Sequence, residues 1–272
     1  MDSIKTIAVT GKGGAGKTVL ATLLIRWLAA KYPGEILAID ADSASSLPYT
    51  LGLQVKRTVS EVRRDLLGKQ QAKDELNAAP TRNVMKKILT PGPGFDLLAM
   101  GRPEEPGCFC AVNELLRFGI DSLIKDYRLA VIDGEAGPEQ LNRRVIKNID
   151  VLLVVADMSA RSLETAAGII KVARSAEHGI SVRRAGLIVN RVRGDEPLSD
   201  LVGKTGLNIF GSIPEDDLLN SFDRSNRPLL ELPLDSPVPL AVKTILERAL
   251  SDAAARSGVY GTIAIVPYGN TL

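Results

Sequence analysis

Short apolar runs of strand length recur along the chain, and most of them are continuous rather than alternating. Continuous runs are typical of strands that are buried on both faces, as in a parallel sheet. Helical patterns separate many of the runs, which predicts strand–helix–strand crossovers. The expected strands are Thr6–Thr10, Ile36–Asp40, Phe95–Met100, Leu129–Asp133, Val151–Ala156 and Gly186–Asn190, and the expected helices are Thr18–Lys31, Ala111–Ile124, Ser162–Glu177 and Val238–Leu250.

This alternation predicts one α/β domain with a doubly wound, mostly parallel sheet and helices on both faces. We expect the domain to span residues 1–256, with residues 257–272 forming a C-terminal tail that either adds an edge strand or extends loosely. The polar span Val55–Pro91 is expected to leave the sheet as helix or loop, and Thr90–Gly94 is expected to be a turn.

The composition of the chain argues against several classes of function. The chain has 272 residues with a formal net charge of +2, and 4% of its residues are aromatic. Near-neutral charge and few aromatic residues argue against a nucleic-acid partner. A single histidine excludes His-rich zinc sites, and two cysteines exclude a disulfide scaffold. No apolar run approaches the length of a membrane span and no secretory signal is present, so we expect a cytoplasmic protein without a membrane partner.

A glycine-rich segment, Gly11–Thr18, directly follows the first expected strand and precedes a helix. It reads Gly-Lys-Gly-Gly-Ala-Gly-Lys-Thr and fits the P-loop motif in its required context. Glycines let backbone N–H groups turn toward the phosphates, the Lys17 ammonium suits the β- and γ-phosphates, and the Thr18 hydroxyl suits Mg²⁺. A P-loop NTPase domain is therefore predicted, and its expected nucleotide-contacting residues here are Gly13, Gly14, Ala15, Gly16, Lys17, Thr18 and Val19.

Acidic residues end two expected strands near this loop. Asp40 and Asp42 end the second strand, and Asp133 ends an apolar run in the Walker B pattern. Carboxylates at the carboxyl ends of parallel strands face the ligand crevice. We expect Thr18, Asp40 and Asp133 to hold Mg²⁺, and the pair of acids after the second strand also suits an attacking water. The small residues Gly134–Gly137 are expected to form a loop that switches when the γ-phosphate arrives.

Asn190 and Arg191 end the last expected strand. An amide carries both a donor and an acceptor, so Asn190 can recognise the edge of a nucleotide base. The chain contains no N-K-x-D motif of the kind that specifies guanine, which favours ATP over GTP.

A second lysine, Lys12, makes the phosphate loop similar to the deviant Walker A motif of a group of ATPases. The group includes septum-positioning and plasmid-partition ATPases, nitrogenase iron protein and metal-insertion ATPases. The resemblance implies a nucleotide-bridged homodimer in which Lys12 reaches the partner's phosphates. It also implies that Asp42 orients or activates water and that Asn190 contacts adenine, with Arg191 and the loop around Pro214 among the expected base-binding residues. Family members often have proline after the second acid, where this chain has Ser43, so the resemblance does not define the local turn.

The catalytic residues expected on this basis are Lys12, Lys17 and Asp42. From chemistry alone, a second cation beside the polyphosphate would offset the charge that develops in phosphoryl transfer.

Cys108 and Cys110 lie near the start of an expected helix, where the thiolate form is favoured. One chain supplies two sulfur ligands, whereas a two-fold dimer would supply four, a set suited to zinc and workable for nickel. The alternative is a pair of unligated core residues.

Four features together resemble the nickel-insertion ATPases of carbon monoxide dehydrogenase maturation, the CooC type. They are the deviant Walker A motif, Asp-Ala-Asp, the C-x-C pair and Asp-Gly-Glu-Ala-Gly, and the likeness runs over roughly Ile4 to Leu250. The resemblance implies an ATP-dependent metallochaperone whose homodimer binds nickel or zinc and delivers it to carbon monoxide dehydrogenase. The alternatives are a positioning or partition ATPase that acts on membrane or DNA, and nickel insertion into acetyl-CoA synthase. The nearly uncharged tail argues against the membrane version.

Overall fold

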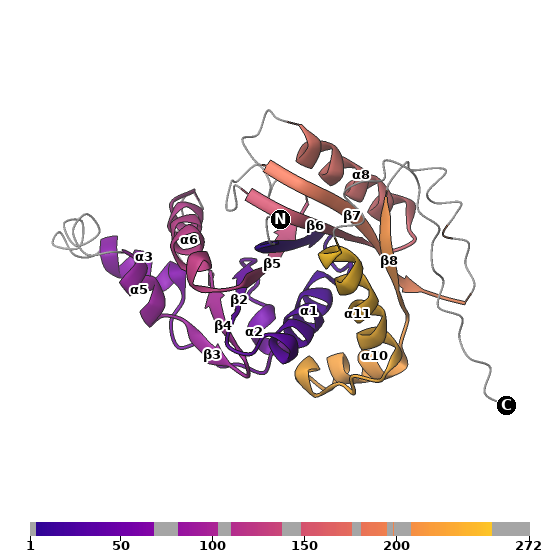
Figure 1. The fold of residues 1–272 in the computed structure, drawn as a ribbon, viewed down its shortest axis with the longest axis horizontal. Coiled ribbons are helices and arrows are strands. Elements are labelled where there is room, and N and C mark those ends of the chain that lie inside the picture. The colour runs from indigo at the N-terminus through magenta and orange to yellow at the C-terminus, as the bar shows by residue number, and fades with distance from the viewer. Residues whose placement is uncertain are drawn as a thin grey trace.

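The computed structural model describes residues 4–67, 81–102, 110–137, 148–175, 181–194, 198 and 208–251. Its described strands form one eight-stranded sheet with the order β3-β4-β2-β5-β1-β6-β7-β8 (Figure 1). Neighbouring strands run parallel, except that β3 is antiparallel to β4. The strands are β1 (Thr6–Gly11), β2 (Ile36–Ala41), β3 (Thr90–Gly92), β4 (Phe95–Ala99), β5 (Leu129–Ala136), β6 (Asn148–Ala156), β7 (Ser181–Val192) and β8 (Ile209–Pro214).

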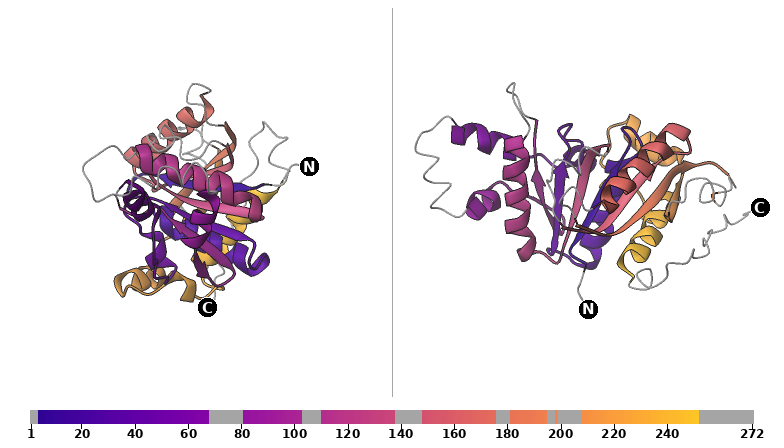
Figure 2. Two further views of the ribbon diagram at one scale, coloured as in Figure 1. Left: turned by 90° about the vertical axis from the view of Figure 1, so that its left-hand side faces the viewer. Right: turned by 90° about the horizontal axis from the view of Figure 1, so that it is seen from above.

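Helices cover both faces of this sheet, as the three ribbon views show (Figures 1 and 2). One core lies between the sheet and α3, α5, α6 and α8, and the other lies between the sheet and α1, α2 and α11. The predicted doubly wound architecture is therefore confirmed. The helices are α1 (Lys17–Lys31), α2 (Leu47–Thr50), α3 (Val59–Leu67), α5 (Thr81–Lys87), α6 (Cys110–Leu123), α8 (Ala160–Arg174), α10 (Asp217–Arg224) and α11 (Pro237–Leu250), with 3-10 turns η1 (Ile124–Asp126) and η3 (Leu229–Glu231).

Strand periodicity divides the buried residues between the two cores. Successive side chains of a strand point to opposite faces. In β1, Ile7 and Val9 therefore pack on the α1 side, while Ala8 packs on the α6 and α8 side. Because both faces are buried, the central strands are apolar throughout, which is the pattern that the sequence shows.

Three sequence predictions about individual elements need correction. Ile213 and Pro214 end strand β8 instead of lying in a loop. Thr90–Gly92 forms strand β3 and pairs with β4, so the expected turn is limited to Pro93 and Gly94. Residues 134–136 continue β5, because this strand still pairs with β1 at Ala136. The expected tail at residues 257–272 and the domain boundary before it lie outside the described residues.

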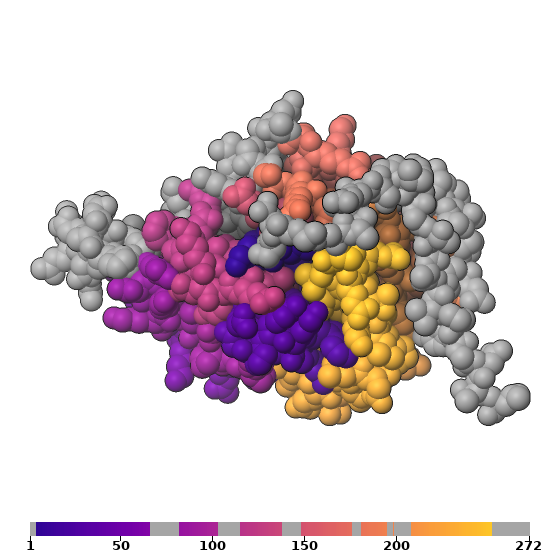
Figure 3. Space-filling model, in the orientation of Figure 1, coloured from indigo at the N-terminus to yellow at the C-terminus, as the bar shows by residue number. Residues whose placement is uncertain are grey.

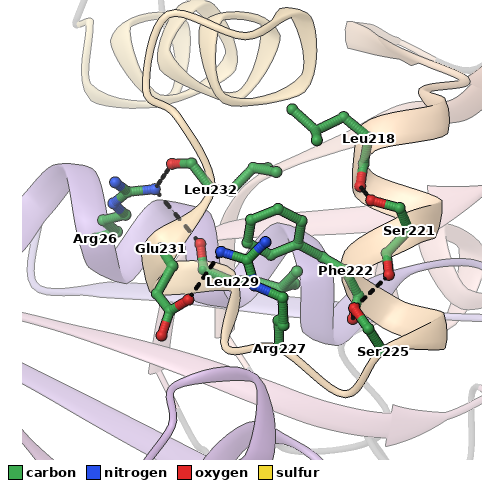
Figure 4. Close-up of polar contacts among 9 residues, drawn as sticks. All are labelled: Arg26, Leu218, Ser221, Phe222, Ser225, Arg227, Leu229, Glu231 and Leu232. Atoms are coloured by element: carbon green, nitrogen blue, oxygen red, sulfur yellow. Dashed lines mark hydrogen bonds and ion pairs between the residues drawn. The ribbon is translucent and has the colours of Figure 1, made fainter.

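The helix that follows the phosphate loop is fixed at its far end by polar contacts. The Arg26 guanidinium of α1 donates hydrogen bonds to the main-chain oxygens of Leu229, at 3.4 Å, and Leu232 (Figure 4). The neighbouring Trp27 indole N–H donates to the Pro239 carbonyl at 2.9 Å. Figure 3 shows α11, in yellow, lying beside α1, in indigo, on this face of the molecule. These contacts tie α1 to the segment that runs from η3 into α11. Because the phosphate loop joins α1 at the N-terminal end of this helix, the same contacts help to hold the loop.

Within the described part of the chain, no helix has both the length and the apolar character needed to cross a bilayer.

Candidate nucleotide-binding site

The phosphate loop leaves the carboxyl end of β1 and enters α1 at the centre of the sheet. Gly14 and Gly16 have φ angles of +76° and +97°, a backbone region that favours glycine. A Cβ atom on Gly16 would also lie 2.2 Å from Asn190 Nδ2. Gly16 precedes the first turn of α1 and offers no side chain to cap it. The N–H groups at this helix end therefore remain available to an anion.

Lys17 is the buried cation of this loop. Its side chain is 8% exposed, and its Nζ atom lies 3.5 Å from the main-chain oxygen of Lys12. Burying an ammonium group is costly unless anionic groups compensate it. The phosphates of a nucleotide would provide that compensation. The other two members of the first turn, Thr18 and Val19, are half-buried.

Asp40 and Asp133 are neighbours on strands β2 and β5, where they form one register pair. They are 0% and 1% exposed. Asp40 Oδ1 accepts a hydrogen bond from the Asp42 main-chain N–H at 3.1 Å. Asp40 Oδ2 and both carboxylate oxygens of Asp133 have no hydrogen-bond partner among the described residues. Three buried oxygens without donors fit a hard divalent cation such as Mg²⁺.

The burial of this pair changes its protonation. Burial, together with the Asp133 carboxylate beside it, raises the pKa of Asp40 to about 8. Burial likewise raises the pKa of Asp133 to about 7, while the Thr18 hydroxyl and the Lys17 ammonium oppose the rise. A cation between the two groups would favour their ionised forms. The described residues contain no group of three or more His, Cys, Asp or Glu side chains that could hold a metal ion. Two carboxylates and a threonine hydroxyl nevertheless suit Mg²⁺, which keeps waters and phosphate oxygens as its other ligands.

Asp42 lies just beyond β2 and is half-buried. Its Oδ1 atom accepts a hydrogen bond from the Ala44 N–H at 2.8 Å, and its carbonyl accepts one from the Ser45 N–H at 3.0 Å. Ser43, which stands where the resembled family often has proline, donates its hydroxyl hydrogen to Glu135 Oε1 at 3.2 Å. Asp42 is therefore held in a short hydrogen-bonded turn, and its second carboxylate oxygen has no hydrogen bond to the described residues.

The residue that sequence reasoning missed is Asp157. It follows the last residue of β6, and the backbone register places it beside the phosphate loop. Burial opposes ionisation of its carboxyl, but hydrogen bonds from Ser159 and the positive charges of Lys12 and Arg191 lower its pKa. An acid directly after an apolar run was the signal that identified Asp40 and Asp133, and the same signal is present here.

Asn190 lies over the phosphate loop and is 7% exposed. Its Nδ2 atom donates to the Ala15 carbonyl at 2.7 Å, and its Oδ1 atom accepts from the Arg191 N–H at 2.9 Å. An amide group has a second hydrogen and a second lone pair, which leaves one of each for a base. Arg191 has a φ of +58°, and Pro214 ends the neighbouring strand. The contact of Asn190, Arg191 and Pro214 with adenine stays a prediction.

The predicted cysteine ligands lie at the limit of a described segment of the chain. Cys108 lies outside the described residues, and α6 begins at Cys110, whose side chain is also outside them. The metal role of the pair stays a prediction, as does the reach of Lys12 into a partner subunit.

Sequence comparisons identify relatives over most of the chain. The family model of the CobQ/CobB/MinD/ParA nucleotide binding domain (CbiA) matches residues 6–229. An uncharacterized ATP-binding protein of Methanocaldococcus jannaschii is 40% identical over 252 residues, which cover 90% of this chain and 98% of that protein. The carbon monoxide dehydrogenase accessory protein CooC of Rhodospirillum rubrum is 27% identical over 240 residues, which cover 83% of this chain and 89% of that protein.

Solved structures show the same fold. The MinC:MinD cell division complex of Aquifex aeolicus matches with a TM-score of 0.68 at 23% identity, covering 90% of this chain and 94% of that chain. The septum site-determining protein MinD of Pyrococcus horikoshii, complexed with Mg-ADP, matches with a TM-score of 0.67 at 19% identity, covering 94% and 100%. The chain therefore belongs to the CobQ/CobB/MinD/ParA nucleotide-binding family and is a P-loop ATPase.

Proposed function

We propose that this ATPase is a metallochaperone that uses ATP to control a homodimer carrying nickel or zinc, with carbon monoxide dehydrogenase as its client. The observation that carries the proposal is the relationship to the CooC accessory protein over 83% of the chain, in a sequence that also contains the C-x-C pair. In a two-fold dimer, Cys108 and Cys110 of both subunits would supply four thiolates to the transported ion.

The site geometry supports the nucleotide half of the proposal. The backbone of the loop and the Lys17 ammonium would bind the phosphates, and Thr18, Asp40 and Asp133 would hold Mg²⁺. The bound cation would neutralise charge on the β- and γ-phosphates. Asp42 accepts a hydrogen bond from the attacking water and aligns it with the γ-phosphate. Water adds to the phosphorus atom, the bond to the β-phosphate oxygen breaks, and ADP and phosphate leave.

Lys12 connects hydrolysis to assembly in this proposal. Its ammonium would contact the partner's phosphates, so the dimer forms with ATP bound and loosens when the γ-phosphate is gone. Replacing Lys12 with alanine should leave ATP binding to the single subunit intact while ATP-dependent dimerisation is lost. Light scattering with and without ATP measures dimerisation, and binding of a fluorescent ATP analogue measures nucleotide affinity, so together they separate the two effects.

Metal analysis of the full-length protein tests the cargo. We expect about one nickel or zinc ion per two chains in the purified dimer. The double variant Cys108→Ser/Cys110→Ser should lose this ion and keep its ATPase activity. Full metal retention in the double variant would overturn the metallochaperone proposal.

Sedimentation with liposomes or DNA in the presence of ATP tests the positioning or partition alternative, and ATP-dependent pelleting would favour it. Delivery of nickel to acetyl-CoA synthase instead of carbon monoxide dehydrogenase would identify the other client.

A further inference from the structure

Strand β5 contains a bulge at the edge of the nucleotide site. Val9 of β1 pairs with Asp133, but Gly11 pairs with Ala136, so Thr10 lies opposite two residues, Gly134 and Glu135. A bulge redirects the side chains beside it, and such bulges concentrate next to active sites. The Thr10 hydroxyl donates to the Glu135 main-chain oxygen at 3.4 Å, which fixes the bulged residue to the strand that enters the phosphate loop.

The bulged residue contacts the loop that carries Asp42. Ala41 and Gly134 are register partners on β2 and β5, so the chain that leaves β2 after Ala41 starts beside the last residues of β5. The half-buried Glu135 carboxylate accepts the hydrogen bond from the Ser43 hydroxyl at 3.2 Å. Ser43 is the residue directly after Asp42. A hydrogen bond thus joins the turn after β2 to the end of β5.

The turn itself behaves as one unit. The side chain and the carbonyl of Asp42 accept hydrogen bonds from Ala44 and Ser45, so the backbone of residues 42–45 is closed on itself. The Asp42 N–H donates to Asp40 Oδ1 and ties the start of the turn to β2. The Ser43–Glu135 hydrogen bond adds a second tie, to a residue that Thr10 holds against β1, and so fixes the turn relative to β5.

We propose that Ser43 and Glu135 are positioning residues that orient the Asp42 carboxylate toward the water that attacks ATP. This inference rests on the role of Asp42 in the proposed function. Their proposed role needs no contact with the nucleotide, because the serine hydroxyl and the glutamate carboxylate act through the turn that carries Asp42. Catalytic geometry tolerates small displacements poorly, so loss of the link lowers turnover while the phosphate contacts remain.

Steady-state ATP hydrolysis by the full-length protein tests the inference. Ser43→Ala removes the hydrogen-bond donor and should lower kcat about tenfold, which corresponds to the loss of one hydrogen bond to a charged acceptor. The KM for ATP should not change. Ser43→Thr retains the hydroxyl and should restore most of the activity. Glu135 has further contacts, so Glu135→Ala is combined with Ser43→Ala in a double-mutant cycle. Ser43→Ala should have no further effect once Glu135 is replaced.

Two controls make the outcome specific. Ser236→Ala removes a serine hydroxyl that donates to the Pro233 carbonyl at 2.6 Å, at the start of α11 and outside the proposed link, and should leave kcat unchanged. Asp42→Asn should abolish hydrolysis and keep ATP binding. If Asp42→Asn is inactive but Ser43→Ala turns over at the wild-type rate, the link is overturned and the role of Asp42 stands. Additive effects in the cycle, or a Ser43→Thr variant as slow as Ser43→Ala, would overturn it as well. Normal hydrolysis by Asp42→Asn would overturn both the link and the proposed role of Asp42.

Discussion

Replacing Asp40 with asparagine should stabilise the nucleotide-free protein at neutral and alkaline pH. Asp40 is fully buried, and its pKa is raised from 3.8 to about 8 by burial and by the carboxylate of Asp133. Between these two pH values the folded protein retains a proton that the unfolded chain has lost. The free energy of unfolding therefore falls as pH rises.

The magnitude follows from counting protons. Each proton retained only in the folded state lowers the free energy of unfolding by about 1.4 kcal/mol per pH unit. Asp133, whose pKa is raised to about 7, adds a second proton over much of this range. Wild-type stability should thus fall with a slope of nearly two protons between about pH 5 and pH 6, and that of Asp40→Asn with a slope of nearly one. By pH 7 the variant gains about 4 kcal/mol relative to wild type, before any cost of the buried amide.

Urea unfolding at pH 5, 6, 7 and 8, with a chelator and without nucleotide, measures the two slopes. Asp235→Asn is the matched control because it removes an aspartate from the exposed surface and should leave the slope unchanged. Addition of Mg-ATP should stabilise wild type more than Asp40→Asn, since the asparagine offers Mg²⁺ no charge. Equal slopes in wild type and Asp40→Asn would refute the reasoning, because Asp40 would then titrate alike in the folded and unfolded chains.

Three further changes have defined outcomes. Gly16→Ala should abolish binding of a fluorescent ATP analogue, because the new Cβ would meet the Asn190 amide at 2.2 Å and the φ of +97° is strained for alanine. Arg26→Ala should lower the free energy of unfolding in urea by about 2 kcal/mol, because it removes charged donors from two partly buried carbonyls, and Arg26→Lys should recover part of the loss. Asp157→Asn should tighten ATP binding a few-fold at low salt and less at high salt, because it removes a negative charge beside the phosphate loop; unchanged affinity at low salt would contradict the placement of that charge.

The central sheet could be predicted because its strands are buried on both faces and are apolar throughout. The two edge strands that sequence reasoning missed lack that pattern. Strand β8 reads Ile-Phe-Gly-Ser-Ile-Pro and pairs with β7 alone, so its polar positions interrupt the run. Strand β3 has three residues, Thr-Pro-Gly, and exists because the hairpin places them against β4.

The phosphate loop and the acids at the strand ends were also predictable. The P-loop motif, and the acid that follows an apolar strand at the ligand edge of the sheet, can both be recognised in a short stretch of sequence. The structure brings Asp40 and Asp133 together as expected. The contact of Ser43 with Glu135 was not predictable, because it depends on a one-residue register shift between β1 and β5. Such a shift depends on pairing between residues that are more than 120 positions apart, which no local pattern encodes.

The place of β1 at the centre of the sheet has a consequence for biosynthesis. Its hydrogen-bonding partners, β5 and β6, begin at Leu129 and Asn148, so the first strand leaves the ribosome long before either neighbour exists. At about 5–20 residues per second, translation from the end of β1 to the end of β6 takes about 7–30 s. During that interval the nascent chain has a phosphate-binding sequence but no pocket, so cellular ATP cannot assist its folding until the chain has been made as far as Ala156.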